Sequence, residues 1–110
     1  EGQVHGGLSL AVAAALHEEM HYSAEGIPLT TTLADYPLVS AAEVPRFRTF
    51  EMETPTPHNP LGAKGLGESG TVVGTPAVQS AVIDALAPFG VIDLDIPATP
   101  EKVWRAINGR

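Results

Sequence analysis

Residues 54–71 read TPTPHNPLGAKGLGESGT, a run rich in proline and glycine in which a single carboxylate, Glu68, stands near the end. Its three prolines fix φ and lack a backbone donor, whereas its four glycines permit positive φ and close approach of another backbone. This composition predicts neither a regular helix nor a strand. Because loops longer than about 12–15 residues are uncommon in compact domains and are usually functional or disordered, we interpret this one as functional.

Upstream of this loop, one helix and two extended elements are expected. Residues 8–20, LSLAVAAALHEEM, follow two glycines and have the apolar pattern of a buried helix. Residues 21–32 are expected to form a short hairpin that turns at Gly26, because glycine suits the turn and the threonines at 30–32 favour extended structure. Residues 46–53 have the alternation of a strand.

Downstream of the loop, the pattern predicts a helix, a strand and a second helix. Residues 77–87 form an apolar helical pattern that the following Pro-Phe-Gly would stop. Residues 91–97 alternate, so a strand is expected with its aliphatic side chains facing the core. Thr99 would cap a last helix that has Pro100 in its first turn. The expected fold class is therefore α+β, a mixed α/β arrangement with about three helices and several strands.

Charge and composition limit the possible functions. The net charge is −7 and the six Lys and Arg residues are scattered, so no basic surface for nucleic acid is expected. The chain has no cysteine, which excludes disulfides, thiolate nucleophiles and cysteine-ligated iron–sulfur clusters within it. The longest apolar run, residues 8–16, is shorter than the roughly 20 residues of a membrane span. Neither membrane insertion nor export is expected, which predicts a cytoplasmic protein.

A literal H-E-x-x-H pattern occupies residues 17–21. On a helix, His17 and His21 would lie one turn apart as zinc ligands, and Glu18 would act as base for a bound water. Zinc needs a third protein ligand, for which Glu25 or Glu43 would have to converge on the site. The alternative is a polar last helical turn, whose histidines suit the negative end of the helix dipole. A small zinc metallopeptidase is thus one open hypothesis.

The loop itself contains two further candidates. Residues 65–70 match G-x-G-x-x-G, but a dinucleotide fingerprint must directly follow a buried strand, and the proline-rich segment before it does not permit one. Glu68, in contrast, is a lone carboxylate among glycines whose free backbone N–H groups could face a ligand, which suits a general base. The alternative is an exposed glutamate that interacts with the dipole of the next helix.

The sequence resembles the molybdenum hydroxylase family, which includes xanthine dehydrogenase, aldehyde oxidase and aerobic carbon monoxide dehydrogenase. TPTPHNPLGAKGLGESG at residues 54–70 is similar to the C-terminal signature of the molybdopterin-binding subunit, most of all in carbon-monoxide-dehydrogenase-type large subunits. GQVHGG at residues 2–7 and IPATPEKVWRAI at residues 96–107 extend the resemblance over nearly the whole chain. It implies that residues 1–110 are the C-terminal portion of a molybdopterin-binding domain, as a fragment or a split subunit.

The resemblance also implies roles for individual residues. In the family motif K-G-x-G-E, here Lys64 to Glu68, the glutamate lies beside molybdenum and is the general base that removes a proton from the attacking hydroxyl. Lys64, Gly65 and Gly67 are expected to bind the cofactor, with the glycines allowing close backbone approach. Gln3, in the match to G-Q-x-x-G-G, is expected to hydrogen-bond the pterin.

The implied cofactor is molybdopterin, as molybdopterin cytosine dinucleotide with molybdenum, while iron–sulfur clusters and FAD belong to partner domains or subunits. The implied partners are the remainder of the molybdopterin-binding subunit, those redox subunits and a small-molecule substrate: carbon monoxide, an aldehyde or an N-heterocycle. Family large subunits are several times longer than this chain, so the isolated chain is expected to be inactive. A non-catalytic docking fragment is the remaining alternative.

Overall fold

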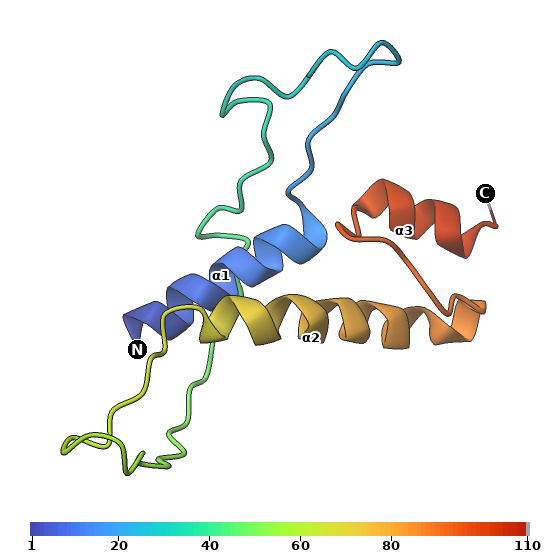
Figure 1. Cartoon of the computed structure of the whole chain (residues 1–110). Helices are drawn as coiled ribbons and strands as arrows, with labels where there is room; N and C mark the ends of the chain where they lie inside the picture. The colour runs from blue at the N-terminus through green and yellow to red at the C-terminus, as the bar shows by residue number, and fades with distance from the viewer. Residues whose placement is uncertain (110) are drawn as a thin grey trace.

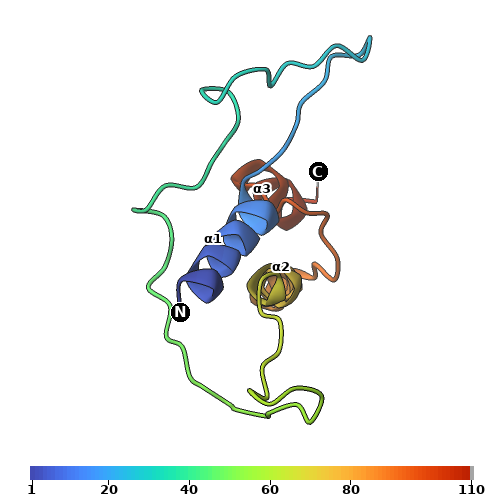
Figure 2. The same ribbon diagram turned by 60° about the vertical axis from the view of Figure 1, so that its left-hand side comes forward.

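The structure is a computed structural model, and it describes residues 1–109. Along the chain it contains α1 (Gly2–Leu16), α2 (Ser69–Leu86), the short 3-10 helix η1 (Ala87–Phe89) and α3 (Pro100–Ile107). Figure 1 shows α1 packed on the first half of α2, and α3 above the C-terminal half of α2. The long connection between α1 and α2 forms two excursions that project from opposite sides of the helices, as Figure 2 also shows.

α1 begins at Gly2, six residues before the predicted start, and therefore includes the glycines expected to precede it. Glycine inside a helix costs about 1 kcal/mol relative to alanine. The packing explains its presence, because Gly7 lies against Gly70 of α2, and a β-carbon at Gly7 would come within 3.0 Å of the Gly70 Cα atom. The glycines allow the two helices to approach closely, and this tertiary contact outweighs the local preference.

α2 begins at Ser69, eight residues before the predicted start and within the predicted loop. It contains Pro76, which lacks the N–H that would pair with the Val72 carbonyl oxygen. An interior proline costs a helix about 3 kcal/mol, and packing against α1 offsets this cost. The helix ends as predicted, since η1 and Gly90, whose φ is 76°, follow it directly.

α3 confirms the predicted last helix. Pro100 occupies its first position, where the missing N–H is not needed, and the Thr99 hydroxyl oxygen accepts a hydrogen bond from the Lys102 N–H at 3.3 Å. The segment before α3 is tied to α1 because the Ala98 N–H donates to the Ala15 carbonyl oxygen at 2.7 Å. These bonds place the start of α3 beside the end of α1.

The predicted α+β fold class is wrong, because the described residues contain no β-sheet. The turn at Gly26 is present, with φ of 82°, but pairing is limited to one bridge between Tyr22 and Pro28. Residues 46–53 and 91–97 are irregular rather than strands. An alternating pattern describes only which side chains share a face, and a strand also needs a neighbouring backbone with which to pair.

Residues 91–97 illustrate the missing partner. The carbonyl oxygen of Leu94 accepts a hydrogen bond from the Gln79 side chain of α2, not from another strand. Ile92, which was expected to face the core, is 90% exposed. This segment is therefore held along α2 by a side chain.

The core consists mainly of small side chains where α1 meets α2 and the segment before α3. The buried hydrophobic residues are Ala11, Val12, Ala13, Ala15, Leu86 and Ala98. Most large apolar side chains lie outside it, and Phe50 and Met52 are 81% and 91% exposed. The radius of gyration is 17.6 Å, against about 13 Å for a compact domain of this length. Much apolar surface is thus uncovered.

Among residues 1–109, the segment Ser69–Phe89 is long and apolar enough, by length and composition alone, to cross a membrane. The core helix of a soluble protein passes the same test. Here α2 packs against α1 through Gly70 and Gly74, both buried, but Val72 and Val73 are exposed, so packing within this chain covers little of the apolar surface of α2. The absence of a membrane span therefore stays a prediction.

Candidate functional site

Glu68 is the residue directly before α2. Its backbone belongs to the helix start, because its carbonyl oxygen accepts from the Val72 N–H at 3.0 Å. Its side chain makes no capping hydrogen bond and is exposed. Within the described residues, the carboxylate has no hydrogen-bond or ion-pair partner. The backbone is thus anchored while the carboxylate is free to act on another molecule.

An open cleft of about 590 Å³ contains this carboxylate. It is lined by Gly65, Leu66, Gly67, Glu68, Ser69, Val72 and Val73. A β-carbon built at Gly65 or Gly67 would meet no atom within 4 Å, so the space in front of this backbone is open. The site therefore combines one carboxylate, accessible backbone and apolar side chains at a helix N-terminus. Such a surface can receive a polar, anionic group close to the backbone.

The predicted site residues are only partly brought together. Gly65, Gly67 and Glu68 line one cleft, whereas the Lys64 ammonium lies 2.6 Å from the Thr54 Oγ1 atom and lines a neighbouring cleft of about 300 Å³. Gln3 lies exposed in the first turn of α1, outside the cleft of Glu68. Within this chain, Lys64 closes the base of the loop, and Gln3 belongs to a different helix from the one that Glu68 precedes.

The side chain of Asn59 organises the loop before Glu68, which the sequence analysis did not anticipate. Its Oδ1 atom accepts from the Leu61 and Ala63 N–H groups at 3.1 and 3.0 Å, and its Nδ2 atom donates to the Ala63 carbonyl oxygen at 2.9 Å. Asparagine commonly bonds the backbone two residues ahead in turns, so the Asn-Pro pair was the available signal. The loop tip is therefore an ordered turn.

The zinc hypothesis does not fit the structure. α1 ends at Leu16, so His17 is its C-cap and His21 lies in irregular chain, without the one-turn spacing that two zinc ligands need. Among residues 1–109, no group of three or more His, Cys, Asp or Glu side chains could hold a metal ion. The polar residues that follow α1 are not positioned as a metal site.

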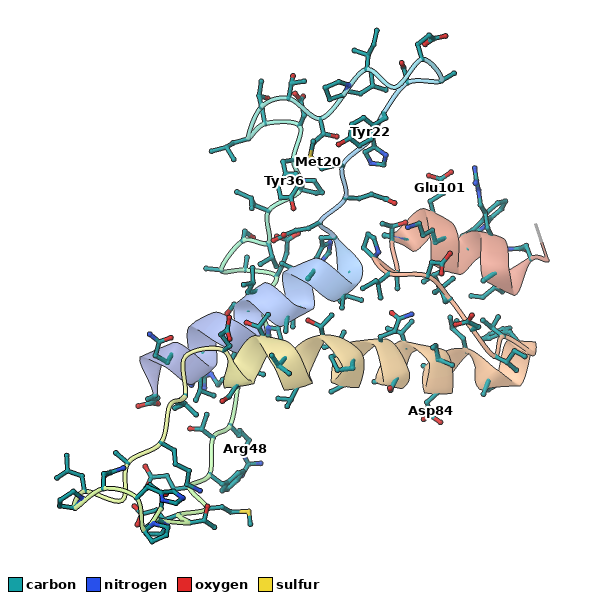
Figure 3. The ribbon with its side chains drawn as sticks, viewed as in Figure 1. Met20, Tyr22, Tyr36, Arg48, Asp84 and Glu101 are labelled. Carbon is teal, nitrogen blue, oxygen red and sulfur yellow. The ribbon has the colours of Figure 1, made fainter. Side chains whose placement is uncertain are left out.

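The two glutamates of this pattern instead make structural contacts. Glu18 accepts a hydrogen bond from the Tyr36 hydroxyl at 2.9 Å, which raises the pKa of Tyr36 above its usual value. Figure 3 shows Tyr36 beside the segment around Met20 that follows α1. Glu19 forms an ion pair with Lys102 of α3 at 2.8 Å. Glu18 therefore already has a partner, and Glu19 links the end of α1 to α3.

Comparison with known proteins shows the family of this chain. Residues 1–45 match the molybdopterin cofactor-binding domain family. The chain is 45% identical, over 98% of its length, to the carbon monoxide dehydrogenase large chain of Hydrogenophaga pseudoflava, and 41% identical, over 99%, to the nicotine 6-hydroxylase large subunit of Paenarthrobacter nicotinovorans. It spans 13% of each of these relatives.

A solved structure agrees with these sequence matches. Quinoline 2-oxidoreductase from Pseudomonas putida 86 superimposes with a TM-score of 0.93 at 42% identity, over 99% of this chain and 14% of that one. A helical segment of the same form thus occurs within a much longer protein. By sequence and by structure, the chain belongs to the molybdenum hydroxylase family, as a part of the molybdopterin-binding large subunit.

Proposed function

We propose that this chain supplies the general base of a molybdenum hydroxylase and that Glu68 is that base. The observation that carries the proposal is the free carboxylate of Glu68, anchored by the start of α2 and exposed to an open cleft. A base must reach its proton without being occupied by another partner. Glu68 meets this requirement, whereas Glu18 and Glu19 of the other candidate motif are already bonded.

The residues of the cleft fit a large cofactor. The open space at Gly65 and Gly67 lets a bulky group approach the backbone, and a large cofactor could also reach Lys64, which lines the neighbouring cleft, and Gln3, which is exposed in the first turn of α1. When bound, molybdopterin cytosine dinucleotide with molybdenum supplies the redox centre of the reaction. The described residues offer no cluster of metal-binding side chains, so the chain's part is to hold the organic portion of the cofactor and to provide the base.

Glu68 removes a proton from the oxygen nucleophile as that oxygen attacks an electron-poor carbon of the substrate. General-base catalysis of this kind contributes about 10²–10⁴-fold to a rate. The helix N-terminus favours a negatively charged side chain at this position. The relatives carry the names of a carbon monoxide dehydrogenase, a nicotine hydroxylase and a quinoline oxidoreductase, so we propose a small-molecule substrate of this range, aldehydes included.

The exposed apolar surface indicates where the rest of the enzyme packs. Phe50, Met52 and Ile92 are each more than 80% exposed, and Leu61 is 89% exposed. Exposed apolar surface of this extent marks an interaction site. We propose that the remainder of the molybdopterin-binding subunit covers it, that iron–sulfur and FAD subunits complete a cytoplasmic enzyme, and that the isolated chain is inactive.

The experiment is Glu68→Gln in the assembled enzyme, with Glu53→Gln as the matched control. Both changes remove one exposed carboxylate, but Glu53 lies outside the cleft of Glu68. Glu68→Gln should lower kcat by about 10²–10⁴-fold or more, with the molybdenum content unchanged, because the base is lost and the site is kept. Glu53→Gln should keep its rate. A fully active Glu68→Gln enzyme would favour a non-catalytic docking segment instead.

A further inference from the structure

A close backbone contact between α1 and α2, made by Gly7 and Gly70, lies two residues after the candidate base. A β-carbon added at Gly70 would lie 3.0 Å from the Gly7 Cα atom and 3.1 Å from the Gly7 carbonyl carbon. A β-carbon added at Gly7 would lie 3.0 Å from the Gly70 Cα atom and 3.1 Å from the Thr71 nitrogen. All of these are backbone atoms, so no rotation of a side chain could relieve the contact.

This contact joins the two parts of the chain that carry the candidate site. Gly70 is two residues after Glu68, and Gly7 is four residues after Gln3, which is about one helical turn. The Thr71 hydroxyl also donates to the Gly7 carbonyl oxygen at 3.4 Å. A change in the separation of the helices at this point must therefore move Glu68 relative to the first turn of α1.

We propose that Gly7 and Gly70 are positioning residues for the reaction, and that their contact sets where Glu68 stands relative to substrate and cofactor. The inference rests on the proposed function of Glu68. Neither glycine touches the reacting atoms, and both act through the placement of α2. The loop before Glu68 does not replace this support. Among the described residues, 65–67 make one backbone hydrogen bond, from the Ser69 N–H to the Leu66 carbonyl oxygen at 3.2 Å, and that bond does not reach α1.

The size of the expected displacement follows from the contact distances. An ordinary β-carbon contact is 3.4–4 Å, whereas the built distance is 3.0 Å, so alanine at Gly7 requires the helices to separate by several tenths of an ångström or more. A misplacement of about 1 Å can cost an enzyme about 10²-fold in rate. We therefore expect a loss of about 10- to 100-fold in kcat for Gly7→Ala.

The neighbouring Gly6 provides a matched control. A β-carbon at Gly6 would meet nothing within 4 Å, although both glycines lie within α1. Glycine to alanine raises helix propensity by about 1 kcal/mol at either position. The two variants thus differ only in whether the new methyl group meets α2.

The test compares Gly6→Ala and Gly7→Ala in the assembled enzyme. Four quantities are measured: kcat per molybdenum, KM, the pH dependence of kcat, and the α1–α2 separation in a crystal structure of each variant. Gly6→Ala should match the parent enzyme. Gly7→Ala should widen the crossing, lower kcat per molybdenum, leave KM nearly unchanged and change the pH dependence of kcat, which a loss of folded enzyme would not do.

The result that would overturn the inference is a Gly7→Ala enzyme with the kcat and pH profile of Gly6→Ala, or one whose activity falls only in proportion to its molybdenum content. The proposed function fails separately, if Glu68→Gln keeps full activity. When Glu68→Gln is inactive and the two glycine variants are alike, only the positioning role is refuted.

If the Gly7→Ala chain does not assemble into the enzyme, a second pair of variants tests the same inference. A β-carbon at Gly74 would lie 2.6 Å from the Ala11 Cβ atom, so Gly74→Ala strains the same crossing through a side chain that can be removed. Gly74→Ala should lower kcat per molybdenum, and the double variant Gly74→Ala with Ala11→Gly should restore it. A double variant as slow as Gly74→Ala would contradict the inference.

Discussion

Replacing Asn59 by alanine should loosen the turn that precedes the candidate base while leaving the helices intact. The Asn59 side chain makes three hydrogen bonds to the backbone of Leu61 and Ala63, at 2.9–3.1 Å. All three lie in exposed chain, outside the core formed by α1 and α2. The change therefore tests whether this one side chain orders the loop.

The expected change in hydrogen-exchange rate follows from the hydrogen bonds that protect the individual N–H groups. The Oδ1 atom of Asn59 accepts from the Leu61 and Ala63 N–H groups, and a typical hydrogen bond contributes about 1 kcal/mol net. About 1 kcal/mol corresponds to roughly a fivefold change in an equilibrium constant. Asn59→Ala should thus accelerate hydrogen exchange at both amides by about fivefold.

The assay is hydrogen-exchange mass spectrometry of the assembled enzyme, with overlapping peptides across residues 56–66. Asn59→Asp is the matched variant, because it keeps an oxygen acceptor for both N–H groups and loses only the donor to the Ala63 carbonyl. The aspartate variant should retain most of the protection that the alanine variant loses. Equal exchange in Asn59→Ala and the parent enzyme would refute the reasoning.

Two further predictions concern local structure elsewhere in the chain. Thr99→Ala removes the hydrogen bond from the Lys102 N–H to the Thr99 hydroxyl and should destabilise α3 by about 0.5–2 kcal/mol, measured as faster amide exchange in residues 100–107. Thr99→Ser should keep this cap. Unchanged exchange in Thr99→Ala would contradict the assignment. Two hydrogen bonds from Ser40 to the Glu43 carboxylate lower the pKa of Glu43 below its usual 4.5. The bond from the Ser40 side chain has the larger effect, and the bond from the Ser40 N–H has the smaller one. Since the folded-state pKa is the lower one, the stabilisation is present above pH 4.5 and is lost as the pH falls through the folded value. The melting temperatures of the parent and Glu43→Gln should therefore converge with acidification, and a difference that does not depend on pH would contradict this.

The sequence predicted those features that depend on a few neighbouring residues. The cap at Thr99, the turn at Gly26 and the helix stop at Gly90 were all correct, because each rests on local backbone geometry. Glu68 was expected inside the glycine-rich loop, whereas the structure places it directly before α2, which begins at Ser69. Its role as base was suggested only by the resemblance to the family, and it stays a prediction.

The errors all concern interactions between distant parts of the chain. Residues 46–53 and 91–97 form no sheet, because in the described residues no backbone pairs with them, and the hairpin at residues 21–32 is limited to one bridge. The zinc hypothesis needed the H-E-x-x-H pattern to lie on a helix, but α1 ends at Leu16, directly before the pattern begins. Local pattern alone could not decide which of these residues would find partners elsewhere.

The sequence by itself determined the family, the candidate base in its glycine-rich loop and the caps and turns, since these are properties of short stretches of chain. Only the tertiary structure decided where α1 and α2 begin. Both helices extend through glycines, and α2 also through Pro76, because Gly7 meets Gly70 at the crossing, and that contact joins residues more than sixty positions apart. Helix propensity disfavours glycine and proline at these sites, and close packing between the two helices outweighs it.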